Sequence, residues 1–194
     1  KPCALIGVAE KGTSNYGFSV RAKGGHSSAP LPNSPVDILA QACLNIKSKP
    51  FPFRITEPAA LLIDNLARHS SFTYRLIFAN LWLFKPVLNL ICQKSGGELN
   101  ALFRTTTAFT VFKAGEAANV LPSSADMLIN LRILPGETLE GTLEALRQKT
   151  ADDRVQVSLV RGQGPSACSG TDGAGYAALC RAIGEVYPGV LISP

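Results

Sequence analysis

The chain has 194 residues, of which 46% are hydrophobic and 17% are charged, so it can form a packed core and is not expected to be disordered. The net charge of +5 raises the question of an anionic partner, but the basic residues are scattered, which favours a solvated surface. Five cysteines without metal-type spacing predict neither a disulfide framework nor a cysteine metal site. The opening residues do not form a secretory signal, and we expect the chain to be cut from a longer one. Its compartment is therefore unknown, with the cytoplasm as the default.

The first part of the chain predicts a strand, a loop and a helix in succession. Residues 16–23 alternate apolar and polar side chains, which predicts a strand with one buried face. Ser34 and Asp37 predict a helix start, because serine caps a helix and an acid is favourable near its positive end. The loop between them, 24–30, holds His26, one of two histidines in the chain. Loops mounted on rigid elements commonly carry function, so His26 is a candidate site residue, with a solvated loop histidine as the alternative.

Residues from about 51 to 104 read as a helical insertion. A short helix is expected at 58–68 and a longer apolar helix at 74–92. Polar residues interrupt the longer segment, which therefore lacks the roughly 20 consecutive apolar residues of a membrane span. We expect the insertion to pack on the domain, with a contact surface for a partner as the alternative.

The second part of the chain predicts further strands and helices. Strands are expected from apolar alternation and threonine or aromatic content at 105–112, 125–133 and 155–159. A helix is expected to begin at 135–138. Without the insertion, the order is strand, helix, strand, strand, helix, strand. This predicts an α+β, ferredoxin-like split βαβ fold (βαββαβ), with a four-stranded antiparallel sheet and two helices on one face. A later helix at 176–187, with its apolar side inward, has no place in that unit.

Two other classes of function suit the same topology. An RNA-binding sheet is disfavoured because Phe109 and Phe112 are expected on opposite faces, whereas such sheets stack bases on one aromatic face. A stand-alone ferredoxin-like module, regulatory or binding a small ligand, leaves the glycine–histidine loop unexplained. We therefore expect neither a nucleic-acid partner nor a membrane partner.

Four short motifs carry a resemblance to a known family. They are Ala9-Glu10-Lys11-Gly12, Gly25-His26-Ser27-Ser28-Ala29-Pro30, Asn119-Val120-Leu121-Pro122 and Asn130-Leu131-Arg132-Ile133-Leu134-Pro135-Gly136. Their order and spacing resemble the lid, or dimerisation, domain of the zinc aminoacylase and carboxypeptidase family, which includes acetylornithine deacetylase, succinyl-diaminopimelate desuccinylase and carboxypeptidase S. The long insertion is most similar to that of the carboxypeptidase S and N-acyl-amino-acid hydrolase branch.

The resemblance implies a domain organisation and a hydrolytic function. Residues 1–12 would end the first half of a catalytic domain, 13–165 would form the lid with its insertion at about 51–104, and 166–194 would start the second half. The full enzyme would be a homodimer through the lid, cleaving an amide bond of a peptide or N-acyl amino acid with zinc. This chain lacks the H-x-D and H-x-x-E-H spacings of zinc sites. We expect it to bind no catalytic zinc and to be inactive alone.

The same resemblance implies roles for three residues. His26 would reach the partner subunit's active site and hydrogen-bond the oxyanion of the tetrahedral intermediate, a donor role suited to an imidazole N–H. Asn119 would help to hold the substrate, and Arg132 would bind a substrate carboxylate through its planar guanidinium. The alternatives are a turn-forming asparagine and a surface arginine.

Overall fold

The computed structural model describes residues 2–194, apart from the side chains of Thr73 and Tyr74, and the chain forms two compact units. One unit, here the sheet unit, comprises Lys11–Pro52 and Thr105–Pro165. The other, here the helical unit, comprises the residues up to Glu10 together with Phe53–Arg104 and Ser166–Pro194. Each unit is therefore assembled from segments that are distant in the sequence.

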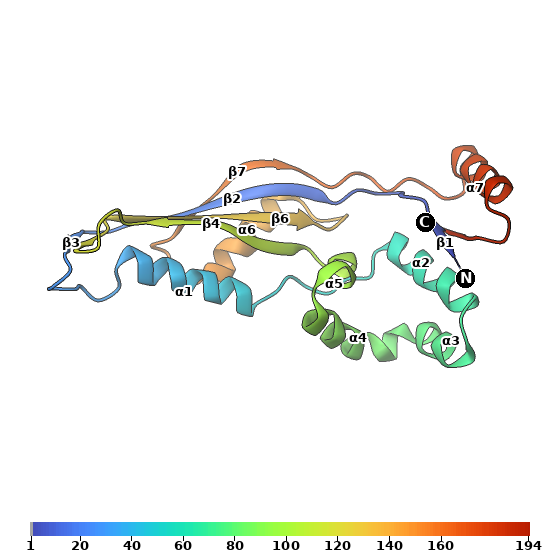
Figure 1. The fold of residues 1–194 in the computed structure, drawn as a ribbon, viewed down its shortest axis with the longest axis horizontal. Coiled ribbons are helices and arrows are strands. Elements are labelled where there is room, and N and C mark those ends of the chain that lie inside the picture. Colours follow the sequence, from blue (N-terminus) through green and yellow to red (C-terminus); the bar gives the residue numbers. More distant parts are fainter. Residues whose placement is uncertain (1) are drawn as a thin grey trace. The chain divides into compact units, whose positions relative to one another are not determined.

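The sheet unit is built on four antiparallel strands, in the order β4-β6-β2-β7 (Figure 1). They are β2 (Gly12–Arg21), β4 (Thr106–Ala114), β6 (Ser124–Ile133) and β7 (Gln156–Gln163). The apolar residues at every second position of β2 and β6 are buried on the same face. The predicted strands and the α+β class are thus confirmed.

Helices α1 (Pro35–Ser48) and α6 (Leu139–Thr150) pack on that apolar face of the sheet. The start of α1 follows from a capping box, in which the Ser34 hydroxyl accepts from the Asp37 N–H and the Asp37 carboxylate accepts from the Ser34 N–H at 2.9 Å. The core between the sheet and the two helices contains side chains that are at most 1% exposed, among them Tyr16, Phe18, Leu39, Ile129 and Leu146.

The expected orientation of two aromatic residues is wrong. A β-bulge at Thr110 places Phe109 opposite Ile129 and Phe112 opposite Met127, so both rings lie on the helix-covered side of the sheet. The sequence alternation assumed an unbroken strand, in which residues three apart face opposite ways. Val111, which follows the bulge, faces the open side instead. The open side therefore takes no aromatic residue from β4, which also argues against a base-stacking surface there.

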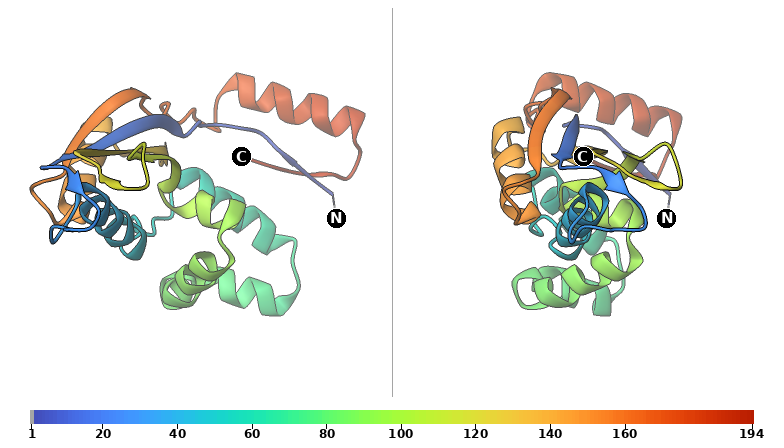
Figure 2. Two further views of the ribbon diagram at one scale, coloured as in Figure 1. Left: turned by 60° about the vertical axis from the view of Figure 1, so that its left-hand side comes forward. Right: turned by 90° about the vertical axis from the view of Figure 1, so that its left-hand side faces the viewer.

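The helical unit contains five helices among the described residues (Figure 2). They are α2 (Glu57–Arg68), α3 (Phe72–Ala79), α4 (Leu81–Ser95), α5 (Gly97–Phe103) and α7 (Ala174–Val186). The continuous helix expected over 74–92 is broken at Asn80, whose backbone has φ −117° and ψ 39°. Its side-chain amide donates to the Leu76 carbonyl at 2.8 Å, which satisfies an acceptor at the end of α3.

Two short parallel strands, β1 (Cys3–Leu5) and β8 (Leu191–Ser193), bring the ends of the chain together. The insertion contacts this pair, because the Asn65 amide donates to the Ser193 hydroxyl at 3.1 Å. Helix α7 has no buried residue in the described structure, and Leu179 is 52% exposed, contrary to the inward-facing expectation. All five cysteines are free, and no helix among residues 2–194 is long and apolar enough to cross a bilayer.

Candidate functional site

His26 lies in a two-stranded ladder at one end of the sheet. Strand β3 (Gly25–His26) pairs antiparallel with β5 (Val120–Leu121), close to the end of β2 and the beginning of β6 (Figure 1). The ladder continues from the main sheet through a hydrogen bond from the Ala22 N–H to the Ser123 carbonyl at 3.0 Å. The sheet therefore positions His26 through backbone pairing.

A glycine is required where the two segments approach. A Cβ added at Gly24 would lie 2.8 Å from the Leu121 carbonyl oxygen, a main-chain atom that cannot move aside on its own. A Cβ at Gly25 would meet only the end of the Leu121 side chain, at an ordinary 3.9 Å. Gly24 is thus the position of the pair where close backbone contact excludes a side chain.

Local hydrogen bonds orient the imidazole of His26. The backbone N–H of Ser28 donates to Nδ1 at 3.2 Å, and the Ser28 hydroxyl lies 2.8 Å from the same nitrogen. Because a backbone N–H can only donate, this arrangement leaves Nδ1 as the acceptor and the proton of the neutral ring on Nε2. The exposed ring then presents Nε2–H as a donor to whatever approaches it.

Asn119 lies beside the same loop. Its backbone carbonyl accepts from the Ser27 N–H at 3.1 Å, and the next residue, Val120, stands opposite His26 in the ladder. The structure therefore brings together two of the three predicted site residues, which are far apart in the sequence.

A hollow of about 680 Å³ borders this ladder. It is lined by the two glycines of the loop and by residues of the 115–124 turn and strand, and its ionisable lining groups are His26 and Glu116. Sequence reasoning did not single out Glu116, because a glutamate in a polar turn has no spacing that distinguishes it. The hollow places a carboxylate and an imidazole on one concave surface.

Arg132 lies at the other end of β6. The register pairs Ser124 with Arg21 and Arg132 with Thr13, so Ser124 and Arg132 are about 26 Å apart at about 3.3 Å per residue. Arg132 is exposed and faces away from the helices, as its alternation with buried neighbours requires. One copy of the sheet unit therefore does not bring Arg132 to His26.

Lys11 interacts electrostatically with both Glu137 and Arg132. Burial lowers the pKa of Lys11 to about 8, with the Glu137 carboxylate opposing this shift and the Arg132 guanidinium adding to it. Glu137 is held by Thr105, whose hydroxyl donates to it at 2.5 Å and accepts from the Leu134 N–H at 2.8 Å. Sequence patterns alone do not reveal this position of Lys11, because the pairing of β2 with β6 creates it.

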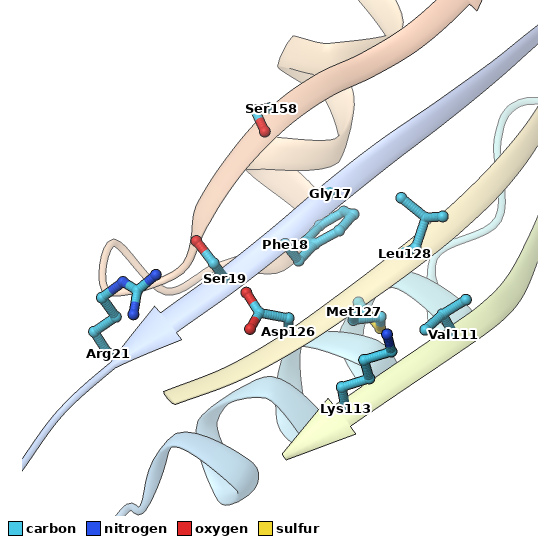
Figure 3. Close-up of a pocket in the computed structure, with 10 residues that line it drawn as sticks. All are labelled: Gly17, Phe18, Ser19, Arg21, Val111, Lys113, Asp126, Met127, Leu128 and Ser158. Atoms are coloured by element: carbon cyan, nitrogen blue, oxygen red, sulfur yellow. The ribbon is translucent and has the colours of Figure 1, made fainter. Parts of the chain in front are cut away.

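A second, smaller hollow lies on the open face of β2, β4 and β6. It has a volume of about 380 Å³, and Figure 3 shows the charged side chains of Arg21, Lys113 and Asp126 around it. None of the three predicted site residues is among its lining residues.

The described residues contain no group of three or more His, Cys, Asp or Glu side chains that could hold a metal ion. A catalytic zinc is normally held by three protein ligands, so the side chains of residues 2–194 do not fit such a centre. The sheet unit is an α+β domain that displays hydrogen-bonding and cationic side chains at its two ends.

Comparison with known sequences identifies the family. Residues 8–156 match the M20 peptidase dimerisation domain, and the chain belongs to this family. The predicted family and branch are confirmed, since the similar curated proteins include carboxypeptidase S-like and N-acyl-amino-acid hydrolase sequences.

Two curated relatives illustrate this similarity. A probable carboxypeptidase S-like 2 from Dictyostelium discoideum is 36% identical over 195 residues, which cover 100% of this chain and 37% of that protein. The N-fatty-acyl-amino acid synthase/hydrolase PM20D1 of Mus musculus is 38% identical over 193 residues, which cover 98% and 38%. The chain therefore spans less than two fifths of the length of these relatives.

Solved structures support the fold. An M20 family metallo-carboxypeptidase from Sulfolobus solfataricus has a TM-score of 0.60 and 14% identity, covering 99% of this chain and 53% of that one. Human carnosine dipeptidase 1 has a TM-score of 0.56 and 16% identity, covering 100% and 45%.

Proposed function

We propose that this chain is the dimerisation domain of a zinc-dependent hydrolase that cleaves an amide bond in a peptide or an N-acyl amino acid. Family membership and the names of the relatives, carboxypeptidase S-like protein and N-fatty-acyl-amino acid synthase/hydrolase, support this reaction class. The strand order β4-β6-β2-β7 with two helices on one face supports a ferredoxin-like sheet unit.

The zinc ligands and the catalytic base would come from a catalytic domain outside residues 13–165. In this proposal the flanking segments 1–12 and 166–194 belong to the two halves of that domain, which is consistent with the parallel pairing of β1 and β8. Zinc would polarise the scissile carbonyl and activate water. The isolated chain would then be inactive, because it supplies only side chains that act on the substrate.

The position of His26 and Arg132 at opposite ends of the sheet supports the assignment of their roles to two different active sites. In a substrate of this class the carboxylate and the scissile carbonyl are only a few bonds apart, whereas Ser124, near the His26 ladder, and Arg132 are about 26 Å apart along β6. The two side chains of one sheet unit therefore act on different substrate molecules. In a homodimer with two-fold symmetry, His26 of one subunit and Arg132 of the other can serve the same active site. Arg132 then binds the carboxylate in its own subunit, while His26 and Asn119 reach into the partner's site.

The orientation of His26 supports its role as an electrophilic donor. An imidazole whose Nδ1 accepts from Ser28 carries its proton on Nε2, ready to donate to an oxyanion. Such donors stabilise the charge that develops on the carbonyl oxygen, and the loss of one lowers kcat by about 10²–10³-fold. His26→Ala is expected to have an effect of that size without loss of zinc or of the dimer.

Hybrid dimers test the proposal in the enzyme that joins this domain to its zinc-binding domain. His26→Ala subunits are mixed with subunits whose metal site is disabled. Roughly a quarter of wild-type activity is expected, because half of the dimers are hybrids and each has one complete site. Arg132→Ala serves as the control, since it should abolish the recovery only when placed in the subunit with the working zinc site. Absence of recovery, with hybrid formation verified by mass, would contradict action across the interface.

A further inference from the structure

The helical unit exposes large apolar side chains over α3 and α4. Trp82 is 77% exposed and Leu83 is 56% exposed, although an isolated helix pair normally turns such groups inward. The exposed set, here the apolar patch, consists of Phe72, Leu76, Trp82, Leu83, Val87, Leu90 and Ile91. Exposed apolar side chains gathered on two successive helices are a feature of interaction sites.

Helix α4 has two apolar faces. One faces the core of the helical unit, where Cys92 is fully buried and Leu81 and Leu88 pack against the same cluster. The opposite face carries four exposed residues at helical spacing, namely Leu83, Val87, Leu90 and Ile91. Packing within the helical unit accounts for the first face and leaves the second uncovered, so the second face is suited to a partner.

The charged residues of α3 and α4 have one sign. Arg75, Lys85 and Lys94 are exposed on α3 and α4, and no Asp or Glu occurs in the sequence between Asp64 and Glu98. Two copies of such a surface would repel each other, which disfavours self-association. Two helices whose exposed apolar side chains include a tryptophan, and whose charged residues are lysine and arginine alone, are typical of segments that lie in the interface of an anionic bilayer.

We propose that α3 and α4 dock onto an anionic lipid surface, with the apolar patch in the interfacial layer and the net positive charge of the two helices attracted to the headgroups. Helix α4 has 15 residues and α3 has eight, so they are too short to span the roughly 30 Å hydrocarbon core and would lie along the surface. The expectation of no membrane partner considered only spanning segments. Surface binding follows from an exposed face, which sequence periodicity alone does not reveal.

The single tryptophan of the chain provides the assay, because Trp82 belongs to the apolar patch. The full 194-residue chain is titrated with vesicles of phosphatidylcholine alone or of equal parts phosphatidylcholine and phosphatidylserine, while tryptophan emission and co-flotation are recorded. We expect a shift to shorter wavelength and flotation with the anionic vesicles, weakening with added salt. Lys85→Glu with Lys94→Glu should lower the partition coefficient at least about tenfold.

Matched variants distinguish lipid binding through the apolar patch from nonspecific adhesion of the chain to vesicles. Leu83→Ser should reduce binding, whereas Leu44→Ser, at a 58% exposed position of α1, should not. Likewise, Lys47→Glu on α1 should have little effect compared with Lys85→Glu. The exposed positions of these changes should leave circular dichroism spectra unchanged.

Three results would overturn the proposal. Unchanged emission with both vesicle types would exclude lipid docking. Equal loss of binding in the α1 controls would assign adhesion to net charge. A concentration-dependent emission shift without lipid, together with dimer mass that Leu83→Ser abolishes, would assign the apolar patch to a second copy of the chain.

Discussion

Replacing Thr105 with valine tests how the start of β4 is joined to the turn before α6. Thr105 is 1% exposed, and its hydroxyl joins the Leu134 N–H at 2.8 Å to the Glu137 carboxylate at 2.5 Å. Valine keeps the shape but removes both hydrogen bonds. The orphaned N–H of buried Leu134 costs about 1–3 kcal/mol, and the lost bond to the half-buried carboxylate adds about 1 kcal/mol. We therefore expect a loss of about 3 kcal/mol in the free energy of unfolding.

Thr150→Val is the matched control, since Thr150 is also 1% exposed. Its hydroxyl donates to the Leu146 carbonyl at 2.8 Å, an acceptor within the same helix that also has a helical backbone partner. The expected cost is below about 1 kcal/mol, because no buried group loses its last partner. Urea unfolding followed by near-ultraviolet circular dichroism would compare the two variants. Equal destabilisation would refute the argument that Thr105 satisfies an otherwise orphaned N–H.

Three further predictions concern the loop, a half-buried cation and a buried hydroxyl. Gly24→Ala should accelerate amide exchange in the β3–β5 ladder, because its Cβ would clash with the Leu121 carbonyl oxygen, whereas Gly25→Ala should leave exchange unchanged. Lys11→Met should stabilise the chain by about 1 kcal/mol at pH 7, after discounting for solvent screening of the half-exposed ammonium. The stability advantage of Lys11→Met should vanish as the pH rises from about 8 to about 10.5, because the native lysine releases its proton before the unfolded one and wild-type stability increases. Urea unfolding at several pH values would measure the difference in stability between the two proteins. A difference that does not change with pH would contradict the lowered pKa of Lys11. Tyr16→Phe should cost about 1–2 kcal/mol in thermal unfolding, because the phenol donates to the first carbonyl of α6 at 2.9 Å, and an unchanged midpoint would show that water replaces the bond.

The elements of the sheet unit could be predicted because their signals are local. Alternating residues in 16–23 and 125–133 identify strands, and the capping pair Ser34 and Asp37 identifies the start of α1. These patterns depend on neighbours within a few positions, so they survive in the folded chain. The bulge at Thr110 could not be predicted in this way, because it becomes visible only through the register of β4 with β6.

The candidate site could be predicted only in part. The glycine–histidine loop identified His26, but its pairing with Val120 joins segments far apart in the sequence. The neighbourhood of Lys11 and Arg132 likewise arises from strand pairing. The exposure of the second apolar face of α4 could not be inferred either, because hydrophobic periodicity shows which residues are apolar and not which of them are covered by a partner.

The discontinuous segments of the two units have a consequence for synthesis. Strand β1 pairs with β8 at the opposite end of the chain, and β2 pairs with β7 after more than half of the sequence has intervened. At about 5–20 residues per second, β1 waits roughly 10–40 s on the ribosome for its partner. Neither unit can close before its last segment emerges, so unpaired strand edges and apolar helix faces stay exposed until that segment has been synthesised. Folding of each unit should therefore be slow, as expected for a topology dominated by long-range contacts.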